Sequence, residues 1–95
     1  MTKEEVLSIT EKVYHRIIHH YGLSKYKETN PYVSIEQSPY SDADVDPDTY
    51  GEYCWMMNEI VIYWKNIDSL EMLTRTLVHE YQHYLQSSSW MKRYY

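Results

Sequence analysis

The chain has 95 residues, a formal net charge of −5, 43% hydrophobic residues, two glycines and three prolines. This length and composition fit a single small domain, residues 1–95, and exclude a linker or a low-complexity chain. The acidic balance argues against binding to nucleic acid, because the longest basic run is only Lys92-Arg93.

The cysteine content and the apolar runs indicate a compartment. Cys54 is the single cysteine, so an internal disulfide is excluded and a reducing compartment fits. No apolar stretch reaches the length of a membrane span, and the residues after Met1 lack the apolar core of a signal peptide. The sequence therefore predicts a soluble, cytoplasmic protein that does not engage a membrane.

An amphipathic helix is predicted over residues 3–21. Thr2 can cap its start, and Glu5 follows three residues later, which is the spacing of a capping box. Gly22 is placed to end it. Apolar residues recur at helical spacing along this segment, at Val6, Ile9, Val13 and Ile17.

Two histidines of this first helix, His15 and His19, are four residues apart and could share a metal ion. On a helical wheel they fall among Ser8, Glu11 and Lys12, on the side away from the apolar stripe. A solvated helix face is therefore favoured over a metal site for this pair.

A short strand is predicted over residues 32–37, between Pro31 and Ser38-Pro39. An acidic loop, residues 41–49, follows it. Its alternating aspartates resemble the start of a calcium loop, but Pro47 stands where the glycine belongs and Tyr53 where the bidentate glutamate belongs. A solvated loop is favoured over a cation site. The aspartates are Asp42, Asp44, Asp46 and Asp48.

Residues 50–64 predict one or two strands, with Met57-Asn58-Glu59 as a turn, because the run Ile60-Val61-Ile62-Tyr63-Trp64 is rich in β-branched and aromatic residues. A second helix is then predicted over residues 69–87. Asp68 is expected to cap it, with Glu71 closing a capping box and Ile67 and Met72 forming a hydrophobic staple.

The second helix is predicted to have two different faces. His79 and His83 project from one face, below Met72 and Thr76, and Glu80 lies between that face and the core. Such a helix packs on the sheet with one face and lines a cleft with the opposite face. The residues expected to pack on the sheet are Leu70, Leu73, Leu77, Tyr81, Tyr84 and Leu85, with Val78 at the edge.

The sequence His79-Glu80-Tyr81-Gln82-His83 spells the motif H-E-x-x-H. On a helix, both imidazoles lie one turn apart on one side and can reach a single metal ion. Zn²⁺ accepts neutral imidazole nitrogen at about 2.0–2.1 Å, and a catalytic site keeps one position open for water. Glu80 is then placed beside that water, where it can act as a general base.

The strand run at residues 60–64, a short capped connection and the helix around His79 and His83 resemble the core of a zincin metallopeptidase, most of all its minimal, gluzincin-type members from bacteria and phages. The resemblance covers about the last half of the chain, and its specific part is the motif helix with the strand before it. It implies an α+β fold in which two helices pack on a small, mostly antiparallel sheet, with the active-site helix C-terminal.

By this resemblance, His79 and His83 are ligands of a catalytic Zn²⁺, and Glu80 is the general base that polarises the metal-activated water and passes its proton to the leaving amine. Residues 50–64 would form the edge of the cleft and pair with an extended peptide substrate. The implied function is a zinc-dependent metallopeptidase that hydrolyses peptide bonds in a peptide or protein substrate.

The chain departs from the family in its third ligand. Residues 84–95 contain no Asp, Glu, His or Cys, and Ser89 stands where a metzincin has its third histidine. The favoured explanation is a fragment whose third ligand lies beyond Tyr95. The others are an upstream ligand, the C-terminal carboxylate or a partner subunit, and a degenerate site. The upstream candidates are Cys54, Glu59, Glu52 and the loop aspartates.

The sequence argues against two other kinds of catalytic site and leaves one alternative function. A di-iron centre needs a second E-x-x-H, which the sequence lacks, and neither Cys54 nor the serines at residues 87–89 have the context of a catalytic nucleophile. The alternative that remains is a catalytically inactive zincin-like domain or a non-enzymatic protein-interaction domain. For the metallopeptidase, the net charge of −5 favours basic or neutral peptide substrates.

Overall fold

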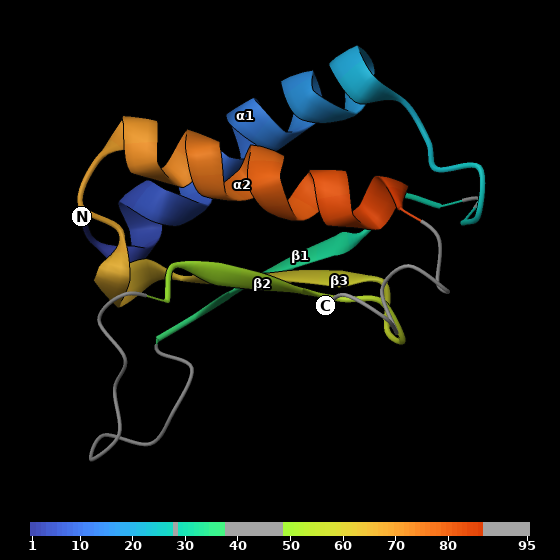
Figure 1. Cartoon of the computed structure of the whole chain (residues 1–95). Helices are drawn as coiled ribbons and strands as arrows, with labels where there is room; N and C mark the ends of the chain where they lie inside the picture. Colours follow the sequence, from blue (N-terminus) through green and yellow to red (C-terminus); the bar gives the residue numbers. More distant parts are fainter. Residues whose placement is uncertain (28, 38–48, 87–95) are drawn as a thin grey trace.

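The computed structural model describes residues 1–27, 29–37 and 49–86. Both helices lie on one face of a three-stranded sheet (Figure 1). The predicted α+β class is confirmed, with the second helix as the last described element. The elements in chain order are α1 (Lys3–Tyr21), β1 (Tyr32–Glu36), β2 (Gly51–Cys54), β3 (Glu59–Tyr63), the 3-10 turn η2 (Trp64–Asn66) and α2 (Leu70–Leu85).

The sheet is mixed, with strand order β1-β3-β2. The central strand β3 pairs in parallel with β1 and antiparallel with β2, so the sheet is not mostly antiparallel as expected. The predicted turn around Met57-Asn58-Glu59 is real: a turn at residues 55–58 joins β2 to β3, and Asn58 adopts a φ of 51° there. Asparagine tolerates this left-handed conformation better than most residues. In this sheet β1 and β2 are therefore the two edge strands.

Helix α1 forms as predicted. The Thr2 hydroxyl accepts from the Glu5 backbone N–H, and the Glu5 carboxylate accepts from the Thr2 backbone N–H, so the capping box is complete. These hydrogen bonds lower the pKa of the Glu5 carboxyl. The helix ends at Gly22, whose φ of 76° suits glycine. His15 and His19 are exposed, and the described residues offer them no third metal ligand.

The start of α2 differs from the prediction by one residue. Ser69 is the cap, with its hydroxyl accepting from the Met72 backbone N–H at 3.1 Å, whereas Asp68 precedes the helix. Glu71 is therefore out of place for a capping box and pairs instead with Arg75 at 2.8 Å. Asp and Ser are equally good caps by residue type, so the local pattern cannot distinguish the two starts.

The core lies between the helices and the inner face of the sheet. The fully buried residues of α2 follow the spacing i, i+4, i+8 and i+11, which places them on one side of a helix. Leu70 was expected in this group, but it is 55% exposed. It lies in the first turn of α2 and faces the groove towards Val13 and Ile17 of α1 rather than the sheet. The buried residues are Leu73, Leu77, Tyr81 and Tyr84.

Tyrosine hydroxyls attach α2 to the loop that follows α1. Tyr81 donates to the Gly22 carbonyl, while Tyr84 donates to the Lys27 carbonyl at 3.2 Å and accepts from the Ser24 backbone N–H at 3.1 Å. Burial raises the pKa of Tyr81 to about 12, so its hydroxyl stays protonated. These bonds fix the C-terminal half of α2, which carries the predicted metal ligands.

Two further predictions need to be placed. The first strand ends at Glu36, one residue earlier than expected. The acidic loop, with Asp42, Asp44, Asp46 and Asp48, lies outside the described residues. Neither helix in the described part of the chain combines the length and the apolar character that a membrane span requires.

Candidate metal centre

His79, Glu80 and His83 come together on α2, with candidate ligand atoms all within 4.8 Å of one another. The two imidazole rings stand nearly perpendicular, with centroids 4.8 Å apart and their Nε2 atoms separated by 3.2 Å. His79 is exposed and His83 is half-buried. The motif therefore forms a cluster that is open to solvent on one side and supported by the helix on the other.

The separation of the two Nε2 atoms fits a shared zinc ion. Two nitrogens bound tetrahedrally at about 2.0–2.1 Å from Zn²⁺ lie about 3.3–3.4 Å apart. The observed separation of 3.2 Å needs almost no movement to reach that value. Imidazole nitrogens are also donors that zinc accepts.

Gln86, the C-cap residue of α2, orients one of these imidazoles. Its Oε1 lies 3.0 Å from His83 Nδ1 and accepts the Nδ1–H in the tautomer that leaves the Nε2 lone pair for a metal. Burial lowers the pKa of His83, the bond to Gln86 raises it, and neighbouring His79 lowers it. The net lowering favours the neutral imidazole, which is the form that binds metal.

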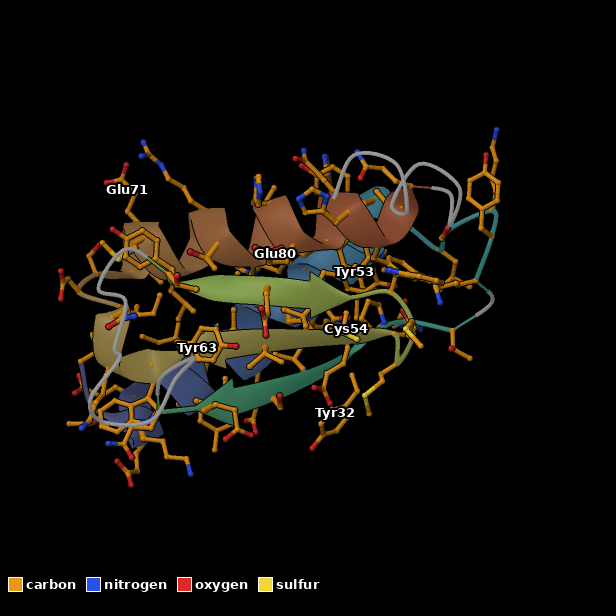
Figure 2. The ribbon with its side chains drawn as sticks, turned by 60° about the horizontal axis from the view of Figure 1, so that its bottom comes forward. Tyr32, Tyr53, Cys54, Tyr63, Glu71 and Glu80 are labelled. Atoms are coloured by element: carbon orange, nitrogen blue, oxygen red, sulfur yellow. The ribbon has the colours of Figure 1, made fainter. Side chains whose placement is uncertain are left out.

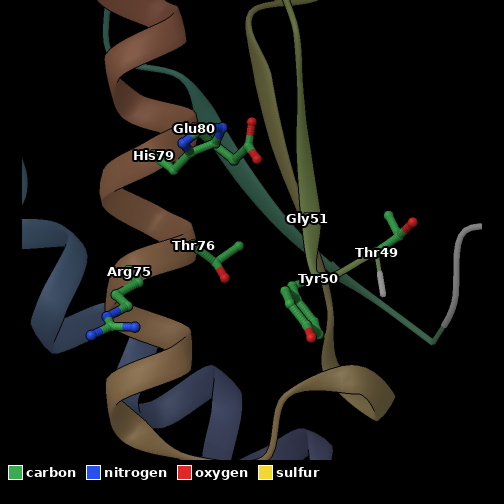
Figure 3. A pocket seen from close by; sticks show the side chains of 7 residues that line it. All are labelled: Thr49, Tyr50, Gly51, Arg75, Thr76, His79 and Glu80. Carbon is green, nitrogen blue, oxygen red and sulfur yellow. The ribbon is translucent and has the colours of Figure 1, made fainter. Parts of the chain in front are cut away.

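Glu80 points from α2 towards strand β2 (Figure 3). Its side chain is only 5% exposed, and Thr76, one turn earlier, is 8% exposed. Glu80 was expected between the cleft and the core, and the structure places it on the buried side, against the sheet edge. Thr76 was expected above the histidines but is covered by β2 as well.

A pocket of about 480 Å³ lies between α2 and the start of β2 (Figure 3). The α2 side consists of Arg75, Thr76, His79 and Glu80, and the strand side of residues 49–51. The pocket therefore places a carboxylate and one of the two imidazoles directly opposite the backbone of an edge strand.

The strand side of the pocket is held by the hairpin and η2. The Thr49 carbonyl accepts from Asn66 Nδ2 at 2.6 Å, and the Tyr50 carbonyl accepts from the Tyr63 backbone N–H at 3.0 Å. Gly51 lies so close to α2 that a Cβ there would be 2.8 Å from Thr76 Cγ2. The absence of a side chain at Gly51 lets the strand approach the helix.

The described upstream candidates for a third ligand, Glu52, Cys54 and Glu59, are on the other face of the sheet. Tyr53 packs against Tyr84 of α2, so its neighbours in β2, Glu52 and Cys54, point away from the helix. Glu59 pairs in register with Cys54 and shares its face. Figure 2 shows Cys54 and Glu80 on opposite sides of the sheet. The loop aspartates and the C-terminal carboxylate lie outside the described residues.

The sequence pattern missed several residues of this site. Arg75 and Gln86 are placed by helical spacing, four residues before His79 and three after His83, and this signal could have identified them. Tyr50 and Gly51 carry no such signal, since their position depends on how the hairpin packs against α2. Gly51 is one of two glycines in the chain, which was a hint of a close approach.

Comparisons with known proteins add no assignment. No protein-family model, no curated protein and no solved structure matches this chain. The chain is a small α+β domain with a candidate metal-binding His79–Glu80–His83 group on its second helix, α2.

Proposed function

We propose that the protein is a zinc-dependent metallopeptidase of the zincin type. The observation that carries the proposal is the placement of His79, Glu80 and His83 within 4.8 Å of one another, beside a pocket that an edge strand closes. A metal site that serves only stability is usually enclosed by four protein ligands. Here His79 is exposed, and this accessibility supports a site that admits a substrate.

In this proposal His79 and His83 hold the metal through Nε2, and Gln86 keeps His83 in the required tautomer. Zn²⁺ bound there would supply a Lewis acid that polarises the scissile carbonyl and makes a water acidic near neutral pH. Glu80 takes the proton from the attacking water and gives it to the leaving amine. Its burial against β2 fixes the carboxylate in one direction, which suits a group that must transfer a proton twice.

Strand β2 is the proposed binding surface for the substrate backbone. It is an edge strand of the described sheet, and its first residue lines the pocket. An extended peptide that pairs with this edge would lie along the same pocket as Glu80, with its backbone bonded and its side chains alternating. This arrangement favours recognition of unfolded or extended segments rather than of a folded surface.

The first test is zinc stoichiometry, measured by elemental analysis on protein purified without chelators or a histidine tag. We expect about one zinc per chain, lost in His83→Ala. The matched control is His19→Ala, because His15 and His19 have the same spacing on an exposed helix face and should not hold the metal. Equal zinc in all three proteins would refute the site.

The second test separates binding from catalysis. Glu80→Gln should keep the zinc but lose cleavage of an unfolded protein such as reduced, alkylated casein, followed by mass spectrometry. Loss of a general base typically lowers the rate by about 10²–10⁴-fold. Unchanged cleavage in Glu80→Gln would exclude the proposed role of Glu80.

A non-enzymatic interaction domain is the competing function, and a specific feature favours it. Large apolar side chains are exposed at one end of the molecule, where the β2–β3 turn meets the loop after α1. Lys27 Nζ donates to the Trp55 carbonyl and joins the two segments. If the protein binds no zinc, this surface becomes the better guide to function. The exposed residues are Tyr26, Tyr32, Met56 and Met57.

A further inference from the structure

Among the residues that the structure describes, Arg75 is the one lysine or arginine that lines the pocket beside Glu80. It lies four residues before His79 on α2, so their backbones are about 6 Å apart along the helix axis. The other described lining residues, apart from His79 and Glu80, are uncharged. In a chain with a net charge of −5, this cation is a local feature rather than a reflection of the overall charge.

The ion pair between Arg75 and Glu71 is weak enough for Arg75 to bind another carboxylate instead. Its guanidinium pairs with Glu71 at 2.8 Å, but the two side chains are 79% and 73% exposed. An exposed pair at this helical spacing changes an equilibrium constant by only about twofold. A ligand carboxylate that displaces Glu71 would accept two parallel hydrogen bonds from the guanidinium.

Resting on the proposed function, we propose that Arg75 selects substrates that carry a carboxylate one or two residues from the bond that is cleaved. The spacing supports this choice, because the backbones of Arg75 and His79 are about 6 Å apart along the helix axis, and an extended peptide covers that length in about two residues, at about 3.3 Å per residue. The carboxylate is either an acidic side chain or the free C-terminus of the peptide. The net charge of −5 opposes acidic ligands at long range, but salt screens that effect beyond about 8 Å.

The test uses a matched pair of small metal-binding probes on the zinc-loaded full chain. One probe is a hydroxamic acid with a terminal carboxylate, and the other carries a primary amide in its place, each with linkers of two, three and four methylenes. Calorimetry gives the two affinities. We expect the carboxylate probe to bind about tenfold more tightly at the best linker length, as a charge-assisted bond allows.

Variants assign the preference to one side chain. Arg75→Gln should remove the preference and leave the amide probe unchanged, while Arg75→Lys should keep part of it, because an ammonium cannot bind in the bidentate mode. Glu71→Gln should increase the preference about twofold by removing the competing carboxylate. The control for net charge is Arg16→Gln, since Arg16 lines the groove between α1 and α2 instead.

Peptide substrates then distinguish the two sources of the carboxylate. Amidation of the peptide C-terminus should slow cleavage if the terminal carboxylate is recognised, and an internal Glu→Gln change should slow it if the side chain is. Equal affinity of the two probes for the wild type, or a preference that survives Arg75→Gln, would overturn the role of Arg75 alone. If neither probe binds, the accessible metal site fails, and the inference fails with it.

Discussion

Replacing Gly51 by alanine tests whether the close approach of β2 to α2 shapes the pocket. A Cβ at this position would lie 2.8 Å from both Thr76 Cγ2 and the Val61 carbonyl oxygen, and 3.2 Å from Ile62 Cδ1. Two of these distances are well inside van der Waals contact, and one of them is to backbone. The strand and the helix must therefore move apart for alanine to fit.

The expected cost follows from overpacking. An extra carbon in a tightly packed interior costs about 1–3 kcal/mol, while removing a glycine from the unfolded chain returns about 0.4–1 kcal/mol. We therefore expect Gly51→Ala to lower the free energy of unfolding by about 1–2 kcal/mol. For a domain of this size each kcal/mol corresponds to about 4–8 °C in Tm.

Urea unfolding followed by circular dichroism measures this change, and a second substitution assigns it. Thr76→Ser removes Cγ2 but keeps the hydroxyl that donates to the Met72 carbonyl at 2.8 Å. It should restore about 0.5–1 kcal/mol in the Gly51→Ala background. The carbonyl contact remains, so the rescue is partial.

The other glycine provides the control. Gly22→Ala should also destabilise, because its φ of 76° strains an L residue, but nothing lies within 4 Å of a Cβ there. Thr76→Ser should not rescue it. A Gly51→Ala protein as stable as the wild type, or equal rescue in both backgrounds, would refute the packing argument.

Three further predictions concern the metal ligands and the core. Gln86→Ala should weaken zinc affinity by about 10–100-fold, as loss of a supporting hydrogen bond typically does. Gln82→Ala, at an exposed position of the same helix, should leave the affinity unchanged. Competition with a zinc chelator measures both affinities. The pKa of His83 in the folded protein is lowered below its ordinary value of 6.5. The neutral imidazole therefore contributes stability above about pH 6.5. This stability is lost as the pH falls through the folded-state pKa. The difference in unfolding free energy between wild type and His83→Gln, measured without metal from pH 8 to 5, should show this loss. Thr10→Val should stabilise the protein by about 1 kcal/mol in thermal unfolding, because the Thr10 hydroxyl is buried and has no hydrogen-bond partner in the structure as described. Thr76→Val, which deletes an existing hydrogen bond, should not raise the stability.

Features set by neighbours along the chain were predicted well from sequence. The capping box of α1 depends on Thr2 and Glu5, and the meeting of His79 and His83 depends on four residues of helical spacing. Both involve residues within one or two helical turns of each other and need no tertiary contact. The turn at Asn58 is local in the same sense.

Features set by packing were not predictable in this way. The burial of Glu80 and Thr76 and the exposure of Leu70 follow from where β2 and α1 lie against α2. The strand pairing decides that Cys54 points away from the candidate metal site, because one residue of register would turn it to the other face. The helical wheel identifies neighbours on one helix but says nothing of which element covers them.

The tyrosine hydroxyls that bond α2 to the loop after α1 have a consequence for how the metal site is assembled. Tyr81 and Tyr84 reach backbone groups about 60 residues earlier in the chain, at Gly22 and Ser24. Such distant contacts close a long loop and form late, after the entropy of closure has been met. We therefore expect the isolated H-E-x-x-H segment to bind no zinc on its own, because its last turn is held in place by the loop after α1. Metal affinity and cooperative folding should fail together in any variant that releases that loop.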